Sequence, residues 1–202
     1  MSKICILDYG SGNVKSVFNA FSTFSNPIIS NSKKDIRDAS HLVLPGVGSF
    51  HRSMSNIRDR IDTEELKNQL HSGKPFLGIC VGMQVLANVG FEFERTNGLG
   101  IVNGEVVSMF QHNELMPHVG WNSVEHQFTS KLFKNIPDGS DFYFVHSFKL
   151  EIDKQDIQLG ITNYGLPFTS AIADENIFGV QFHPEKSQAH GLQLLRNFVG
   201  IS

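Results

Sequence analysis

The segment G-I-C-V-G at positions 78–82 follows the apolar pair Phe76-Leu77 and precedes a second apolar stretch at 85–87. This order predicts a buried strand, a sharp turn that carries one cysteine, and then a helix. The flanking glycines permit a tight turn and the close approach of a substrate to the backbone. A thiol at the amino end of a helix meets the positive end of the helix dipole, which favours the thiolate. Cys80 is therefore the candidate nucleophile.

A histidine and a carboxylate, His183 and Glu185, flank Pro184 much further along the chain. His183 follows an apolar run at 177–180, so we expect it at the carboxyl end of a strand, the edge where doubly wound sheets place their sites. Cysteine, histidine and carboxylate together provide a nucleophile, a base and an orienting group for acyl transfer. The alternatives are a structural histidine in a turn that Pro184 ends, and a solvated carboxylate.

The composition favours one globular domain over the whole chain, residues 1–202. Of the 202 residues 40% are hydrophobic, which allows one sizeable core. The formal charge of −3, with scattered Lys and Arg, gives no electrostatic footprint for nucleic acid or an anionic membrane. No apolar stretch approaches the ~20 residues that span a bilayer, and no signal segment opens the sequence. We expect a cytoplasmic protein that binds neither nucleic acid nor membrane.

Neither the two cysteines nor the nine histidines indicate disulfide or metal chemistry. Cys5 lies in the apolar run 4–7 and is predicted to be a buried core thiol. A disulfide between Cys5 and Cys80 would bury the nucleophile, so a reducing setting fits better. Metal-binding spacings such as H-E-x-x-H and C-x-x-C are absent, and no metal or cofactor is predicted. His146 ends an aromatic run and is either structural or part of the site.

Short apolar runs alternate with helical patterns in the first half, which predicts βαβ units and one three-layer α/β domain with a mostly parallel, doubly wound sheet. Strands are expected there at 3–7, 28–29, 41–44 and 76–79, and helices at 14–24, 49–60 and 63–70. The second half is richer in strands, at 102–107, 121–124, 142–145, 157–161, 168–173 and 177–181. A final helix is expected at 191–199.

Two glycine-containing segments follow predicted strands. The sequence G-S-G-N-V-K-S at 10–16 lacks the glycine that the Walker spacing requires, so a turn that opens a helix is favoured over a phosphate loop, with Asn13 available to a partner or channel. The sequence P-G-V-G at 45–48 leaves the backbone free to aim N–H groups outward, as an oxyanion hole requires. An ordinary strand-to-helix turn is the alternative for 45–48.

These segments together resemble the class I (triad) glutamine amidotransferases, which have a flavodoxin-like fold. Within that class the chain is similar to the glutaminase subunits of imidazole glycerol phosphate synthases. The resemblance covers essentially the whole chain and is carried by D-Y-G-S-G-N at 8–13, L-P-G-V-G at 44–48, G-I-C-V-G-M-Q at 78–84, P-H-V-G-W-N at 117–122, F-Y-F-V-H-S at 142–147 and G-V-Q-F-H-P-E-K-S at 179–187.

The resemblance implies a catalytic role for three residues. Cys80 would attack the side-chain amide of L-glutamine, His183 would exchange protons with the thiol and the departing ammonia, and Glu185 would orient His183. The oxyanion hole would consist of the Val81 N–H and a peptide N–H within 46–48, the segment Gly46, Val47 and Gly48.

The resemblance also implies how the substrate and a partner bind. Gln84 and Glu92 would contact the α-carboxylate and α-amino end of glutamine, and the backbone near Ser147 and Phe148 would close the pocket. A further set would face a (βα)₈-barrel cyclase subunit in a heterodimer: Asn13, Tyr143 and Lys186. Ammonia would pass to that barrel, which would form imidazole glycerol phosphate and the aminoimidazole carboxamide ribotide of histidine biosynthesis.

Some positions depart from the commoner family pattern. Phe148 replaces a frequent tyrosine, Met116 a frequent lysine and Val119 a frequent methionine or isoleucine, and the stretch 88–94 lacks an acidic, serine-containing version. These changes leave the glutaminase residues intact but fall partly at the expected partner surface. The alternative is therefore a paralogue that supplies ammonia for a sugar amidotransferase in surface-polysaccharide synthesis. Cysteine peptidases with a nucleophile elbow lack the His-Pro-Glu segment, and a binding module without activity would show a broken triad.

Overall fold

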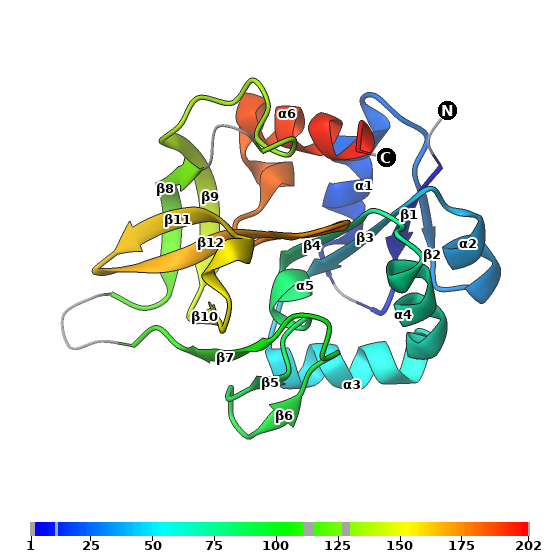
Figure 1. The fold of residues 1–202 in the computed structure, drawn as a ribbon, viewed down its shortest axis with the longest axis horizontal. Helices are drawn as coiled ribbons and strands as arrows, with labels where there is room; N and C mark the ends of the chain where they lie inside the picture. Colours follow the sequence, from blue (N-terminus) through cyan, green and yellow to red (C-terminus); the bar gives the residue numbers. More distant parts are fainter. Residues whose placement is uncertain (1–2, 11, 111–114, 127–129, 202) are drawn as a thin grey trace.

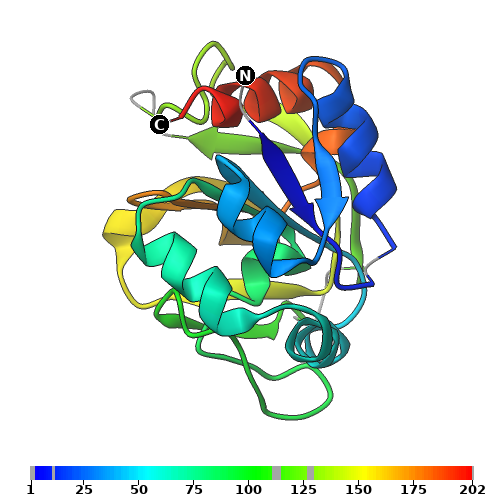
Figure 2. The same ribbon diagram turned by 90° about the vertical axis from the view of Figure 1, so that its right-hand side faces the viewer.

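The computed structural model describes residues 3–10, 12–110, 115–126 and 130–201 (Figure 1). Within these ranges the larger sheet has nine strands in the order β2-β1-β3-β4-β13-β12-β11-β8-β9. Its first five strands run parallel, as Figure 2 shows for β1 and β2. In sheet order these strands are β2 (Ile28–Ser30), β1 (Ile4–Leu7), β3 (His41–Gly46), β4 (Phe76–Cys80) and β13 (Ile177–Val180).

The rest of the larger sheet is antiparallel. Its strands are β12 (Leu166–Asp174), β11 (Gln158–Tyr164), β8 (His118–His126) and β9 (Ser140–His146). The predicted α/β domain is confirmed, with a mixed sheet that is parallel where the βαβ units lie. β13 joins the two parts, because it pairs in parallel with β4 and antiparallel with β12.

Helices cover both faces of the larger sheet, which gives three layers (Figure 1). On one face lie α1 (Val14–Ser22) and α6 (Gln188–Val199). On the other lie α3 (Phe50–Arg60), α4 (Thr63–His71) and the short α5 (Val81–Gln84), together with a small sheet. The small sheet has the order β10-β7-β5-β6, formed by β10 (Phe148–Ile152), β7 (Gly104–Ser108), β5 (Val89–Gly90) and β6 (Thr96–Asn97).

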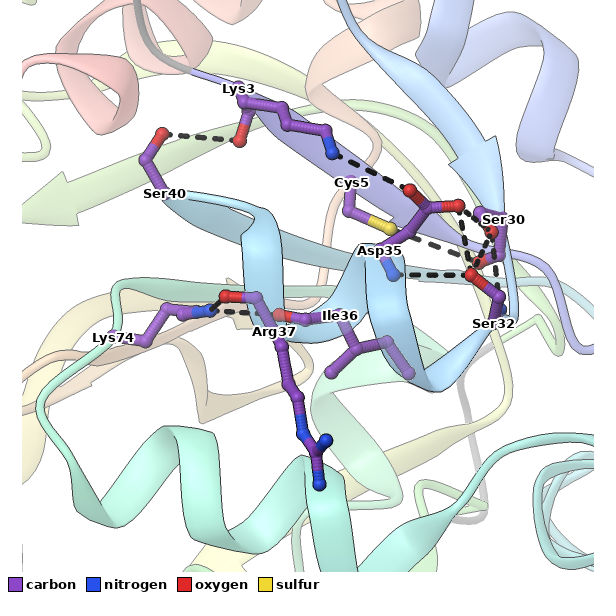
Figure 3. Close-up of polar contacts among 9 residues, drawn as sticks. All are labelled: Lys3, Cys5, Ser30, Ser32, Asp35, Ile36, Arg37, Ser40 and Lys74. Atoms are coloured by element: carbon purple, nitrogen blue, oxygen red, sulfur yellow. Dashed lines mark hydrogen bonds and ion pairs between the residues drawn. The ribbon is translucent and has the colours of Figure 1, made fainter.

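The central strands are almost entirely apolar because both faces of the sheet are covered. Every residue of β1, β3 and β4 is buried. Cys5 in β1 is fully buried, with its Sγ 3.9 Å from the carbonyl oxygen of Ser30 (Figure 3). Burial raises the pKa of the Cys5 thiol to about 12, so this thiol is inert at neutral pH, as expected for a core cysteine.

The helix α2 (Lys33–Asp38) was not predicted, because it is short and has only one buried residue, Ile36. Side-chain hydrogen bonds hold its two ends (Figure 3). The Ser32 hydroxyl accepts from the backbone N–H of Asp35 at 3.1 Å, as an N-cap does. At the other end Lys74 Nζ donates to the carbonyls of Ile36 and Arg37, at 2.8 and 2.7 Å.

The segment after the nucleophile also differs from the expected helix. α5 has four residues and ends at Gln84, while the apolar residues 85–87 are buried in turns. A helix this short has only a small dipole, so it contributes less to thiolate stability than the sequence suggested. The strands β5, β6 and β10 were likewise not expected. Among the described residues no helix is long and apolar enough to cross a bilayer.

Candidate active site

Cys80 sits at the carboxyl end of β4 in a strained backbone conformation, with φ 55° and ψ −114°. Its side chain is almost buried, 3% exposed. The glycines on either side of Cys80 are required because neighbouring backbone atoms leave no room for a side chain. A Cβ on Gly82 would lie 1.8 Å from the carbonyl oxygen of Leu44, and one on Gly78 would lie 2.5 Å from that of Gly82. The elbow is thus packed directly against β3.

His183 reaches Cys80 because β13 and β4 are paired in parallel, with Val180 opposite Ile79. Its backbone N–H donates to the carbonyl oxygen of Tyr143 at 2.8 Å. The imidazole is fully buried, and its Nδ1–H donates to Oε1 of Glu185 at 2.8 Å. The other ring nitrogen, Nε2, makes no hydrogen bond with the described side chains and remains available for proton exchange with Cys80.

The charge of His183 is set by its two neighbours. Burial opposes protonation, but the Cys80 thiolate and the Glu185 carboxylate outweigh it and raise the pKa of His183 to about 10. A raised pKa means that the imidazolium form of His183 persists at neutral pH. The ring can therefore donate a proton from Nε2 to a leaving group beside Cys80.

Asn13, expected at the partner surface, is 6% exposed and lies behind the triad. Its Nδ2 donates to Oε1 of Glu185 at 2.5 Å. The same nitrogen is 3.4 Å from Nδ1 of His183, but that ring atom carries the proton given to Glu185 and cannot accept a second one. Asn13 is therefore hydrogen-bonded to the Glu185 carboxylate and not to the His183 ring. Ser11 lies outside the described residues.

A cavity of about 410 Å³ opens beside the triad, within the size range of small-molecule sites. Most residues expected to bind substrate or form the oxyanion hole line it. They are Val47, Gly48, Val81, Gln84, Glu92, Ser147 and Phe148, and the triad members Cys80 and His183 line it as well. Gly46 does not line the cavity; it lies beneath it, where a Cβ would meet the Tyr9 hydroxyl at 2.7 Å and the Gly82 nitrogen at 2.8 Å.

Two polar side chains in the cavity differ in what they offer a ligand. Both hydrogens of Gln84 Nε2 are used internally, in donation to the Phe148 carbonyl and to Oε1 of Gln181, each at 2.9 Å. Gln84 therefore offers its oxygen as an acceptor. Glu92 accepts from the Phe50 N–H at 2.6 Å, and burial raises the pKa of its carboxyl. A bound ammonium group would favour the ionised form of Glu92.

The two other residues expected at the partner surface lie together at the rim. The Lys186 ammonium is 5.6 Å from the ring centroid of Tyr143, within the range of a cation–π contact. Trp121 packs edge-on against the same ring at 6.1 Å. Lys186 also lines the cavity, so this cluster connects the site with the surface.

Comparisons with known proteins agree with the geometry. Residues 5–201 match the family described as Glutamine amidotransferase class-I. The chain is a class I glutamine amidotransferase. It is 42% identical to "Imidazole glycerol phosphate synthase subunit HisH" of Desulfitobacterium hafniense, over 96% of this chain and 92% of that protein. It is 40% identical to "Imidazole glycerol phosphate synthase subunit HisH 1" of Methanococcus maripaludis, over 98% and 99%.

Solved structures match this amidotransferase at low identity and support its fold. The PurLQS structure from Thermotoga maritima has a TM-score of 0.75 and 17% identity, with 99% coverage of both chains. A glutamine amidotransferase from the same organism has a TM-score of 0.65 and 16% identity, and the match covers 98% of this chain and 81% of that one.

Sequence reasoning missed two features of this amidotransferase site. Gln181 is fully buried, and its Nε2 lies 3.6 Å from Cys80 Sγ. His146, expected to be either structural or part of the site, lines the cavity, but its pairing with His118 was not foreseen: His118 Nδ1 lies 3.0 Å from His146 Nε2. The position of Gln181 one residue beyond a strand that pairs with β4 was a usable signal, but the pairing itself is visible only in the fold. Among the described residues no cluster of three or more His, Cys, Asp or Glu could hold a metal ion.

Proposed function

We propose that this amidotransferase is the glutaminase subunit of an imidazole glycerol phosphate synthase. The observation that carries the chemistry is His183, fully buried between Cys80 and Glu185 at the wall of a cavity. The assignment to this synthase is supported by the relatives named HisH, which match this chain over nearly their full length. They support the histidine pathway over the surface-polysaccharide alternative.

The proposed reaction begins with the Cys80 thiolate, which attacks the side-chain amide carbon of glutamine. The N–H of Val81 and a peptide N–H within 46–48 stabilise the resulting oxyanion. His183 gives its proton to the departing nitrogen, ammonia leaves, and a thioester on Cys80 remains. A water molecule, deprotonated by His183, then attacks the thioester and releases glutamate together with the restored thiolate–imidazolium pair.

Substrate orientation follows from Gln84 and Glu92 among the polar groups that line the cavity. Gln84 presents an oxygen and Glu92 a carboxylate, so both suit the α-ammonium group of glutamine better than its α-carboxylate. The α-carboxylate then needs donors, and the backbone N–H groups near Ser147 and Phe148 are the expected ones. This arrangement would reject a glutamine analogue without the α-amino group, because Glu92 would be left without its cation.

The partner in this proposal is a (βα)₈-barrel cyclase, bound in a heterodimer at the rim that contains Tyr143 and Lys186. Val119 and Trp121 in β8 are 54% and 48% exposed on the same side of the strand, next to this rim. Exposed apolar side chains beside a functional site are typical of a protein interface. Ammonia would pass from the cavity to the barrel without entering bulk solvent.

The test is an assay of glutamine hydrolysis by the purified chain, alone and in the presence of the cyclase with its nucleotide substrate. Glutamate should form, and imidazole glycerol phosphate should accumulate in the complete mixture. Production of glutamate without transfer to the cyclase, but with transfer to a sugar amidotransferase system, would move the assignment to the paralogue. No glutamate under either condition would contradict the proposal.

A further inference from the structure

Gln181 occupies a position that the reaction outlined above does not use. It follows β13 directly, is fully buried, and its backbone N–H donates to the Ser170 carbonyl at 2.9 Å. Its side chain lies between the nucleophile and Gln84, with Nε2 at 3.6 Å from Cys80 Sγ and Oε1 at 2.9 Å from Gln84 Nε2. The side-chain amide of Gln181 is fully buried and has few hydrogen-bond partners. Its orientation therefore decides whether Cys80 Sγ faces the amide nitrogen or the amide oxygen.

The orientation of both glutamine amides is determined by the carbonyl of Phe148. This oxygen can only accept, so the Gln84 atom at 2.9 Å from it must be the amide nitrogen. The second hydrogen of that nitrogen points to Gln181, whose facing atom must then be its oxygen. Consequently the atom that Gln181 presents to Cys80 is its NH₂ group, a donor without acceptor capacity.

The Phe148 carbonyl oxygen is also the last acceptor in a series of side-chain hydrogen bonds. His146 Nδ1–H donates to it at 2.9 Å, which leaves Nε2 of the neutral His146 ring to accept from His118 Nδ1–H at 3.0 Å. Nε2 of His118 accepts from the Asn122 amide at 3.2 Å. Burial lowers the pKa of His118 to about 4 and the pKa of His146 to about 3, so both rings stay neutral with these tautomers at pH 7.

We propose that Gln181 is a positioning residue that presents a dedicated hydrogen-bond donor to the sulfur of Cys80, with its direction set by the Phe148 carbonyl through Gln84. The N–H group stabilises the thiolate over the thiol, because a donor gains energy from an anionic acceptor. It also restrains the position of the sulfur. This inference rests on the proposed role of Cys80 as nucleophile, and it adds a second group, besides His183, that favours the reactive form.

The test compares two variants of Gln181. Gln181→Met keeps the length of the side chain and removes the donor. Gln181→Glu keeps an oxygen that can accept from Gln84 and places a carboxylate rather than an amide beside the sulfur. The measurement is the rate of iodoacetamide alkylation of Cys80 against pH, read by peptide mass spectrometry in the absence of glutamine and partner. Cys5 in the same chain is the internal control, since it is buried and reacts only on unfolding.

We expect the pH midpoint of Cys80 alkylation to move upward by about one unit in Gln181→Met, the size expected for one hydrogen bond to a charged group. Gln181→Glu should move it upward by at least as much. In the hydrolysis assay kcat should fall by about tenfold, with a smaller change in KM. Gln193→Met in α6 is the matched control and should leave all three quantities unchanged.

Unchanged midpoints in both variants, with Cys5 protected, would overturn the inference and leave Gln181 a packing residue. If Gln181→Met does not fold, as shown by alkylation of Cys5, Gln181→Leu, which is neutral and also lacks the donor, decides by the same criterion. The alkylation readout does not depend on glutamine turnover. Shifted midpoints in the variants, together with a wild-type chain that hydrolyses no glutamine, would therefore contradict the proposed function and not the role of Gln181.

Discussion

The side-chain amide of Asn13 and the imidazole of His183 donate to the same oxygen, Oε1 of Glu185, at 2.5 and 2.8 Å. Two donors on one buried carboxylate oxygen fix the plane of the carboxyl group and hence the direction of the imidazole. The second oxygen, Oε2, is buried without a hydrogen bond from the described residues. Asn13 is therefore the main polar restraint on Glu185 besides the triad itself.

Asn13→Ala should lower kcat for glutamine hydrolysis by one to two orders of magnitude, roughly the cost of one charge-assisted hydrogen bond, with little change in KM. Loss of the amide leaves the carboxylate free to rotate away from His183. Asn19→Ala in the neighbouring helix α1 is the control, because Asn19 is exposed. Full activity of Asn13→Ala in the isolated chain, with a defect only in the complex, would instead favour a role at the partner surface.

Cys80→Ser should abolish glutamine hydrolysis, with a loss of several orders of magnitude, because an alcohol at this position is not ionised at neutral pH. Synthase activity of the complex with ammonium salts should survive, since ammonia from solution bypasses the glutaminase step. Both activities are measured on the same complex. Retention of more than a tenth of wild-type hydrolysis would exclude Cys80 as the nucleophile.

The oxyanion segment 46–48 is expected to make the isolated chain a slow glutaminase that the ligand-bound cyclase accelerates. Gly48 has φ +103° and nothing within 4 Å of an added Cβ, so Gly48→Ala changes the backbone preference without a clash. We expect Gly48→Ala to alter the ratio of hydrolysis rates with and without the ligand-bound cyclase. An unchanged ratio would indicate an oxyanion hole that is formed constitutively.

Substitution of Gly46 tests the stability of the turn that carries Cys80. A branched side chain there would meet the Tyr9 hydroxyl and the Gly82 backbone, so Gly46→Val should destabilise the elbow itself. The expected cost is about 1–3 kcal/mol, as for other overpacked sites. Thermal unfolding of Gly46→Val and Gly48→Ala, compared with the wild type, separates the structural effect from the functional one.

The charge of His183 predicts how stability depends on pH. Its folded-state pKa, about 10, lies above the unfolded value near 6.5, so its contribution is fully present below pH 6.5 and is lost as pH rises to 10. Glu185 is one cause of this shift, and its contribution can be measured in a Cys80→Ala background, where no cysteine titrates beside the ring. The loss of unfolding free energy caused by Glu185→Gln in that background should shrink as the pH rises above 6.5. Urea unfolding at several pH values measures it, and a loss independent of pH between 6.5 and 10 would mean that Glu185 does not raise the pKa of His183.

The sequence alone predicted the strands and helices that have a clear hydrophobic pattern. The proximity of Cys80 and His183 was predictable because each lies at the carboxyl end of an apolar run, and the parallel strands β1, β3, β4 and β13 consist largely of such runs. The helix α2 and the strand β10 were missed, because the first is held by side-chain caps and the second has mixed burial. The roles of Gln181 and the inward turn of Asn13 depend on contacts across 101 and 172 positions of the chain, which no local pattern contains.

The position of β13 in the sheet determines what happens to activity when the chain is cut into two fragments. Cys80 belongs to the first half of the chain and His183 to the second, and they meet only because β13 inserts between β4 and β12. A chain cut between β6 and β7 would yield one fragment with the nucleophile and one with the base, neither able to release ammonia alone. Recovered glutamate formation on mixing would then report that the two parallel strand pairs across the cut, β4 with β13 and β5 with β7, had re-formed, so the enzyme's activity would report its own assembly from fragments.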